Sequence, residues 1–137
     1  MPNIYYKTYY HAIWSTKNRV ESIDEQINAL LKRAIFKKTK DLKGILIEYN
    51  SYLDHCHLLA TIPPKISVSE FIGQIKGFSS HEINKTADDS IKWQRGFGVV
   101  TLSEKGVPFI KKYIQNQKQH YKNDKLIDML EHIPEEK

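Results

Sequence analysis

Two short patterns in this sequence combine residue types that could hold a metal ion beside a nucleophile. His55 and His57 flank a single residue, and Tyr113 stands four residues before Gln117. Two imidazoles and one amide oxygen form a three-ligand set that suits Mg²⁺ or Mn²⁺ when substrate phosphate oxygens complete the coordination. A tyrosine hydroxyl can attack a phosphodiester, and the covalent phosphotyrosine splits strand transfer into two reversible steps. Each pattern alone also fits an ordinary role, either a half-exposed histidine pair or a packed tyrosine beside a solvated glutamine.

The two patterns are predicted on different kinds of element. Residues 54–62 have the composition of a strand and end at a Pro-Pro pair. Side chains alternate along a strand, so His55 and His57 should share one face while Cys56 and the apolar residues share the other. A helix over 107–122 with a proline in its first turn would carry Tyr113 and Gln117 on one face.

The other elements complete a β-α-β-β-α-β order. We expect, along the chain, a strand over 4–14, a helix over 23–41 behind a Ser22–Glu25 capping box, a strand from Gly44, a helix from the Ser67–Glu70 capping box to Lys85, and a strand over 93–102. This order predicts an α+β, ferredoxin-like fold, with a four-stranded antiparallel sheet and two helices on one face. The helix over 107–122 is then free to cover the open face. His11, His81, His120 and His132 lack a comparable spacing partner and are expected to be structural or exposed.

Length, cysteine usage and charge narrow the class of protein. At 137 residues the chain is expected to form a single domain, divided into a body (1–102), a hinge (103–106), the tyrosine helix (107–122) and an acidic tail (123–137). One cysteine excludes an internal disulfide framework and fits a reducing cytoplasm. No apolar run approaches 18 residues, so we expect a soluble protein without a membrane partner. The whole chain has a net charge of +5. The segment from Asp124 onward has five acidic and two basic residues and a net charge of −3, so residues 1–123 have a net charge of +8. A basic body favours a polyanionic partner such as nucleic acid.

The chain resembles the small HUH-type single-tyrosine transposases of bacterial and archaeal insertion sequences. The matching segments occur in the family's order and span nearly the full length: 11–19, 54–59, 62–70, 93–98 and 113–117. The middle residue of the histidine motif is Cys56, which is less usual than valine or isoleucine but is still apolar.

The resemblance implies a site, a reaction and partners. His55, His57 and Gln117 would hold the divalent metal, and Tyr113 would attack single-stranded DNA, keep a 5′ phosphotyrosine and release a 3′ hydroxyl. The family recognises DNA hairpins at the element ends and works as a homodimer whose sheets join across the two-fold. Gly106 would be the pivot of the hinge that lets the tyrosine helix serve either subunit. The candidate phosphate contacts are Lys17, Arg19, Lys76, Lys92, Arg95, Lys111 and Lys112.

Two other readings stay open at this point. A non-catalytic binder of single-stranded nucleic acid, or a domesticated relative that binds repeated palindromes, would use the same sheet as a platform. A histidine-metal hydrolase would use water in place of tyrosine. The Tyr113–Gln117 pattern favours the active transposase, because the domesticated proteins tend to lack it.

Overall fold

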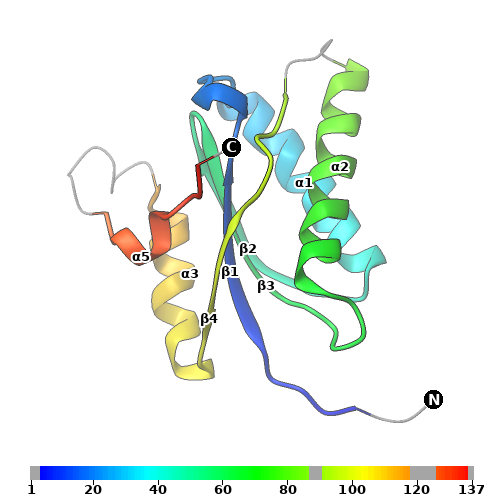
Figure 1. Ribbon diagram of the computed structural model, residues 1–137, viewed down its shortest axis with the longest axis vertical. Coiled ribbons are helices and arrows are strands. Elements are labelled where there is room, and N and C mark those ends of the chain that lie inside the picture. The colour runs from blue at the N-terminus through cyan, green and yellow to red at the C-terminus, as the bar shows by residue number, and fades with distance from the viewer. Residues whose placement is uncertain (1–3, 87–90, 118–125, 136–137) are drawn as a thin grey trace.

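The computed structural model describes residues 4–86, 91–117 and 126–135. A four-stranded antiparallel sheet, in the order β2-β3-β1-β4, has helices α1 and α2 on one face and α3 and α5 on the other (Figure 1). The elements are β1 (Tyr9–Ser15), α1 (Glu25–Asp41), β2 (Ile45–Tyr52), β3 (His55–Thr61), α2 (Val68–Thr86), β4 (Gly98–Leu102), α3 (Val107–Gln115) and α5 (Asp128–Glu131). The predicted ferredoxin-like α+β fold is confirmed.

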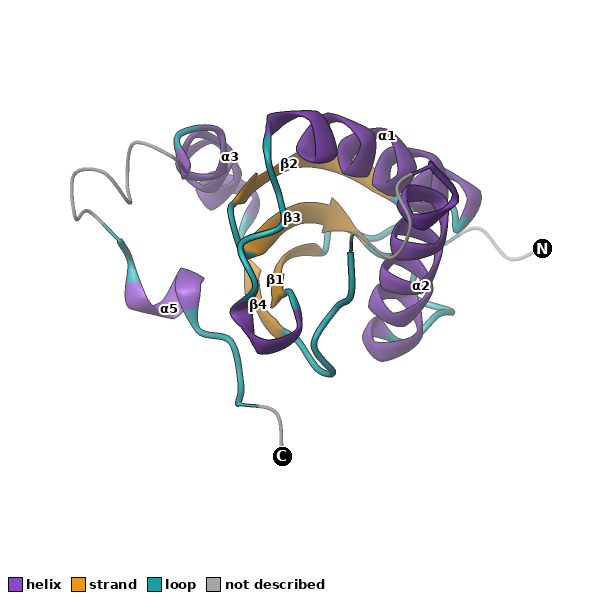
Figure 2. Ribbon diagram, turned by 90° about the horizontal axis from the view of Figure 1, so that it is seen from above, coloured by secondary structure: helices purple, strands orange, loops and turns teal. Residues whose placement is uncertain are grey.

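Strand β3 divides the molecule into two apolar clusters. Its residues Cys56, Leu58 and Ala60 pack beneath α1 and α2 in the larger cluster, which also contains Trp14. Leu59 points the other way and packs in a smaller cluster with residues of α3 and α5. Figure 2 shows the sheet between these two layers of helix. The alternation predicted for residues 54–62 is therefore correct, and the histidine side of β3 faces α3.

The two long helices begin at different kinds of cap. The side chain of Asp24 accepts a hydrogen bond from the backbone N–H of Ile27 at 2.7 Å and so caps α1. The predicted Ser22–Glu25 capping box is wrong, because the carboxylate of Asp24, two residues closer to the helix, caps the Ile27 N–H and also suits the helix dipole. At α2 the expected cap forms, since the Ser67 hydroxyl accepts from the Glu70 N–H at 3.1 Å.

The first and last strands both begin later in the chain than predicted. Strand β1 begins at Tyr9 instead of residue 4, and β4 begins at Gly98 instead of residue 93. Trp93 makes only an isolated bridge to Thr16, and the chain then turns at Gly96, whose φ of +88° favours glycine. Aromatic and β-branched composition therefore extended the predicted strands beyond the residues that find a pairing partner.

Helix α3 lies across β2 and β3, on the face that the two-helix layer leaves open. Its first turn contains Pro108, as predicted. Gly106 ends a 3-10 turn (Glu104–Gly106) with φ −78°, a conformation open to any residue, so the hinge remains a prediction. The prediction of one continuous helix over 107–122 is wrong, because α3 ends at Gln115 and Asn116 is its C-cap. The predicted start of the tail at 123 falls outside the described residues. Within the described ranges, no helix is both long and apolar enough to cross a bilayer.

Candidate active site

The two histidines of β3 lie side by side beneath α3. Both side chains are fully buried, and their ring centroids are 5.1 Å apart. The histidine side chains are buried because α3 and α5 cover this face of the sheet, which would be open to solvent in a fold with α1 and α2 alone. The pair is therefore a preformed feature of the sheet and is shielded from bulk solvent.

A second set of side chains fixes the orientation of each imidazole. The Nδ1 atom of His55 lies 2.8 Å from Oδ1 of Asp54, and the Nδ1 atom of His57 lies 2.8 Å from Nε2 of His11. Both Nε2 atoms are then turned toward the same region, where they approach one carboxylate. This arrangement is typical of metal-binding histidines, whose second ring nitrogen is held by a neighbour.

His11 is thus a residue whose role the sequence did not reveal. It is buried and stacks on His57 with ring centroids 5.0 Å apart. The contact depends on the pairing of β1 with β3, in which Ile13 is opposite His57 and His11 lies one diagonal step away. His81 and His132 are exposed, and His120 lies outside the described residues.

Tyr113 and Gln117 of the same chain reach the histidines. The Tyr113 ring stands edge-on to the His57 ring, with centroids 6.2 Å apart. Gln117 follows α3 by two residues and is fully buried, yet neither its amide oxygen nor its amide nitrogen has a hydrogen-bond partner among the described residues. Asn50 of β2 supports this end of α3 by donating to the carbonyl oxygens of Ile114 and Gln115 at 3.0 and 3.2 Å. The structure therefore brings together the four residues that the sequence singled out, while their roles as ligands and nucleophile stay predictions.

A carboxylate that the sequence analysis did not single out lies at the centre of the group. Oε1 of Glu131 is 3.4 Å from Nε2 of His55 and 3.3 Å from Nε2 of His57. The Tyr113 hydroxyl donates a short hydrogen bond to Oε2 of the same carboxylate. The signal in the sequence for this position is the apolar spacing of Leu126, Ile127, Leu130 and Ile133, which fits a short helix. That helix is α5, and its buried residue Leu130 delivers Glu131 to the site.

The buried side chains of the site shift one another's pKa values. Burial alone would lower the pKa of His55, but hydrogen bonds with Asp54 and Glu131 raise it above its ordinary value. Burial lowers the pKa of His57, and burial together with the neighbouring His57 lowers the pKa of His11 to about 3. Although burial opposes ionisation of Glu131, the two imidazoles and the Tyr113 hydroxyl hold its pKa well below the ordinary range. His11 is therefore neutral, whereas Glu131 carries a negative charge.

The phenol of Tyr113 is held in its neutral form. Burial and the hydrogen bond to the Glu131 carboxylate raise its pKa above the ordinary value of 10.0. The hydroxyl also accepts a hydrogen bond from the backbone N–H of Ile127 at 3.1 Å. These contacts fix the oxygen in place, and a positive charge nearby is needed before it can become a strong nucleophile.

The residues present fit a divalent metal ion. His55, His57 and Glu131 each offer a ligand atom, and the three atoms lie within 4.8 Å of one another. The buried Gln117 amide, without a hydrogen-bond partner in the described part of the chain, is costly unless something else binds it. In such a mixed set the oxygens suit Mg²⁺ and Mn²⁺, and the imidazole nitrogens also suit borderline transition ions such as Fe²⁺ and Zn²⁺.

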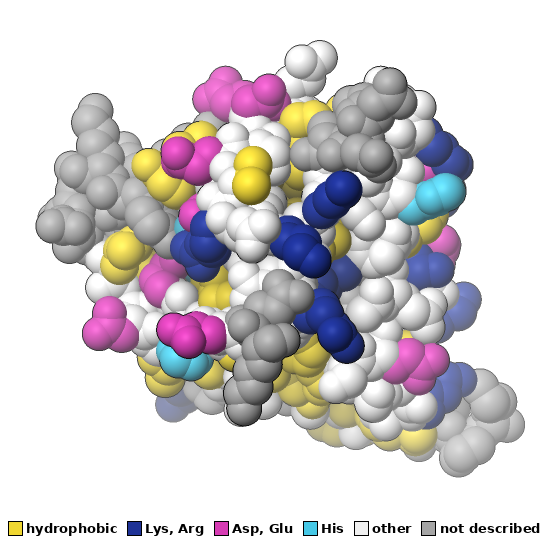
Figure 3. Space-filling model, turned by 45° about the horizontal axis from the view of Figure 1, so that its top comes forward, with side chains coloured by type: hydrophobic (Ala, Val, Ile, Leu, Met, Phe, Trp, Pro, Cys, Tyr) yellow, Lys and Arg dark blue, Asp and Glu magenta, His cyan; other side chains and the backbone are white. Residues whose placement is uncertain are grey.

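The predicted DNA contacts fall into two groups. Five of them, Lys17, Lys92, Arg95, Lys111 and Lys112, have exposed side chains without an ion pair among the described residues, and Arg19 is exposed as well. Arg19 forms an ion pair with Asp54 at 3.0 Å, and Lys76 donates to the carbonyl oxygens of Gln94 and Gly96, both at 2.7 Å. Figure 3 shows Lys and Arg side chains gathered on one face of the molecule.

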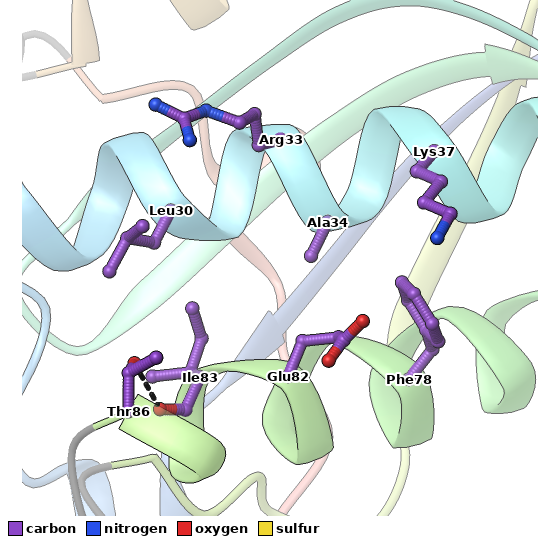
Figure 4. A pocket seen from close by; sticks show the side chains of 8 residues that line it. All are labelled: Leu30, Arg33, Ala34, Lys37, Phe78, Glu82, Ile83 and Thr86. Atoms are coloured by element: carbon purple, nitrogen blue, oxygen red, sulfur yellow. Dashed lines mark hydrogen bonds between the residues drawn. The ribbon is translucent and has the colours of Figure 1, made fainter.

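A separate groove lies between α1 and α2, on the far side of the sheet from the histidines (Figure 4). Lys37 of α1 points toward the Phe78 ring of α2 across it, whereas the Arg33 side chain points away from α2 (Figure 4). It contains neither a histidine nor a nucleophile close to a base, so the candidate site remains at the sheet face beneath α3.

Two curated transposases have sequences similar to this chain. The transposase of insertion sequence IS200 from Salmonella typhimurium is 33% identical over 117 residues, which cover 79% of this chain and 75% of that protein. The ISDra2 transposase TnpA of Deinococcus radiodurans is 26% identical over 120 residues, covering 82% of this chain and 85% of that protein.

Two solved structures share the fold. A protein from Deinococcus radiodurans R1 that is assigned as a transposase superposes with a TM-score of 0.68 at 24% identity, over 85% of this chain and 96% of that one. A REP-associated tyrosine transposase bound to a REP hairpin superposes with a TM-score of 0.62 at 20% identity, over 88% and 73%. The family model described as "Transposase IS200 like" matches residues 4–117, which include every residue of the candidate site except Glu131. The chain belongs to the IS200-like transposase family.

Proposed function

We propose that this chain cuts and rejoins single-stranded DNA through a 5′ phosphotyrosine on Tyr113, with a divalent metal ion held by His55, His57 and Gln117. The observation that carries the proposal is the meeting of two distant segments, in which the Tyr113 ring stands beside the His57 ring and the buried Gln117 side chain interacts with His57. Membership of the transposase family supports strand transfer as the reaction class.

The chemistry follows from the groups present. The Tyr113 oxygen forms a bond to phosphorus, the bond from phosphorus to the 3′ oxygen breaks, and the leaving oxygen takes up a proton to become a 3′ hydroxyl. A bound divalent ion supplies the positive charge that stabilises the phosphate oxygens as negative charge develops. Because a free phenol has a pKa near 10, its ionisation at pH 7 costs roughly 4 kcal/mol before such help. The phosphotyrosine stays linked to the 5′ end, so a 3′ hydroxyl can attack it later and restore a phosphodiester.

Recognition of hairpin-bearing ends forms the second part of the proposal. The structural relative with a REP hairpin bound supports a DNA hairpin as the ligand of this fold. Exposed Lys17, Lys92, Arg95, Lys111 and Lys112 are the phosphate contacts we favour, because their ammonium and guanidinium groups reach solvent. Lys76 and Arg19 already bind protein oxygens, so their first role is to hold loops in place.

A homodimer and a mobile tyrosine helix complete the proposal. Among the described residues β4 pairs only with β1, so its outer edge is available to a second copy. Helix α3 contacts the histidine strand of its own chain, and the turn that ends at Gly106 is where it would swing toward a partner.

The rival from another class is a DNA binder without catalysis. It has no use for a buried phenol beside two oriented imidazoles, nor for an amide left without a hydrogen-bond partner in the described chain. These features favour the catalytic proposal over a binding role alone.

The test is a search for protein-linked DNA. The purified chain is mixed with Mg²⁺ and labelled single-stranded DNA from its own genomic flanks, and the products are separated on a denaturing gel. We expect a covalent adduct that EDTA prevents and that Tyr113→Phe abolishes while hairpin binding is kept. Tyr5→Phe is the matched control, because Tyr5 is 83% exposed and far from the site in sequence. Free 5′ phosphate products without an adduct would point to water as the nucleophile and contradict the proposal.

A further inference from the structure

We propose that Glu131 is a further ligand of the metal ion and, through its second oxygen, the group that positions the Tyr113 hydroxyl. This inference rests on the proposed function above and adds a residue that lies outside the 4–117 segment matched by the family model. It makes the C-terminal segment part of the active centre instead of an accessory tail.

The distances around Glu131 are those of ligands that share one cation. Two atoms that are each about 2.1 Å from a metal lie about 3.0 Å apart at an angle of 90° and about 3.4 Å apart at the tetrahedral angle. Oε1 of Glu131 is 3.4 Å from Nε2 of His55 and 3.3 Å from Nε2 of His57. The carboxylate oxygen and both ring nitrogens are thus already spaced for a common ion, without movement of the backbone.

The orientation of the rings supports the same conclusion. The Nδ1 atoms of His55 and His57 are engaged by Asp54 and His11, each at 2.8 Å, so the Nε2 atoms are the ones directed at Glu131. An imidazole whose Nδ1 carries the proton presents a lone pair on Nε2. Two such lone pairs beside an anionic oxygen attract a cation more strongly than the neutral imidazoles alone.

The second carboxylate oxygen reaches the nucleophile. Oε2 accepts the hydrogen bond of the Tyr113 hydroxyl, and the hydroxyl accepts another from the Ile127 N–H at 3.1 Å. Because a phenol has a single O–H donor, the carboxylate fixes the direction of the Tyr113 O–H bond. One carboxylate therefore ties the metal site to the oxygen that attacks.

The segment that carries Glu131 is anchored on both sides. Leu130 is buried against Leu59 and the α3 side chains, and the carbonyl oxygen of Pro134 accepts from the Gln94 amide at 2.9 Å. The backbone between them passes Gly98 so closely that a Cβ atom there would lie 2.2 Å from the carbonyl oxygen of His132. This fit requires glycine at residue 98 and holds Glu131 at a fixed height over the sheet.

The alternative is that Glu131 blocks the site and must leave before DNA enters. The two roles differ in the effect of removing the carboxylate charge. A ligand is needed for metal affinity, so its loss weakens binding; a plug competes with the metal and with substrate, so its loss strengthens binding or raises cleavage.

The test measures Mn²⁺ binding by the full chain without DNA, using titration calorimetry and the electron paramagnetic resonance signal of free Mn²⁺. We expect Glu131→Gln to weaken Mn²⁺ affinity by about 10- to 100-fold or more. Loss of a group that only supports a metal ligand already has an effect of that size, and a ligand itself should matter at least as much. Glu135→Gln is the matched control, because it removes the same charge from an exposed residue of the same segment. Glu131→Asp keeps the charge but shortens the reach, and we expect it to lose affinity too. It provides the measurement if the glutamine variant does not fold.

A second readout reports on the nucleophile. In protein labelled with ¹³C at the tyrosine ring carbon that carries the hydroxyl, Glu131→Gln should shift the Tyr113 resonance while Glu135→Gln leaves it in place. If the wild-type chain binds Mn²⁺ and forms the DNA adduct, but Glu131→Gln has the same Mn²⁺ affinity and the same Tyr113 resonance as the wild-type chain, this inference is overturned and the proposed function is not. Tighter Mn²⁺ binding or more adduct in Glu131→Gln would overturn it in favour of the plug. Failure of the wild-type chain to bind Mn²⁺ and form the adduct would overturn the proposed function itself.

Discussion

Replacing His11 tests whether the metal site depends on a side chain that never touches the metal. The ring nitrogens of His11 and His57 are 2.8 Å apart, so one of them carries the shared proton. His57 can offer its Nε2 lone pair to a metal only if its own Nδ1 holds that proton and His11 accepts it. The low pKa of His11, about 3, keeps it neutral and able to accept.

Changing His11 to Leu removes the acceptor and leaves a buried N–H of His57 without a partner. An unsatisfied buried donor costs about 1 to 3 kcal/mol, so the ring is expected to turn or to exchange its proton position. Loss of such a supporting hydrogen bond typically lowers metal affinity by about 10- to 100-fold. On the affinity scale this corresponds to roughly 1.4 to 2.7 kcal/mol, which agrees with the cost of the unpaired donor.

The assay is Mn²⁺ titration of His11→Leu, His11→Gln and the wild-type chain, with thermal melts to verify that each variant folds. Glutamine at position 11 restores an amide oxygen as acceptor, so we expect it to recover part of the lost affinity. The exposed His81→Leu change serves as the control for removing a histidine. Wild-type affinity in a folded His11→Leu protein would refute the reasoning, because the orientation of His57 would then not depend on this bond.

Three further outcomes are expected. Replacing His57 by Ala, or adding EDTA, should abolish the DNA adduct, and the gel assay with the wild-type chain and Mg²⁺ as reference shows whether any cleavage remains. Gly98→Ala should weaken Mn²⁺ binding and lower the free energy of unfolding by about 1 to 3 kcal/mol, because the new methyl group overlaps a backbone oxygen of the C-terminal segment. Calorimetry measures the Mn²⁺ affinity and denaturant unfolding measures the stability. Unchanged values of both would contradict the close fit. Lys76→Ala should lower the melting temperature more than Lys92→Ala, since the Lys76 ammonium binds two backbone carbonyl oxygens. Lys92→Ala should instead weaken hairpin binding in a filter-binding assay, and the affinity of this variant should depend less on salt concentration than that of the wild-type chain.

Local patterns were enough to predict the fold and half of the site. The alternation in β3 predicted the shared face of His55 and His57, and the helix that carries Tyr113 covers that face as expected, although α3 ends at Gln115, before Gln117. These predictions succeeded because strand and helix periodicity are properties of neighbouring residues.

The parts that sequence reasoning missed depend on contacts between distant segments. His11 meets His57 through the register of β1 on β3, which periodicity does not specify. Glu131 reaches the site only because the chain returns after residues 118–125 and inserts Leu130 beneath α3. The strand ends at residues 4–8 and 93–97 were misjudged for a related reason, since composition describes a preference for strand but not the presence of a neighbour.

The thiol between the two histidines has a consequence for metal choice. Cys56 is fully buried among the apolar side chains under α1 and α2, so the sheet itself separates its sulfur from the imidazoles on either side of it. Ions that seek sulfur, such as Cd²⁺ or Cu⁺, therefore gain nothing from the one cysteine in the chain. A shift of β3 by a single residue would turn Cys56 outward but carry both imidazoles into the apolar core, so strand register is the feature that presents nitrogen ligands, and not sulfur, to the site.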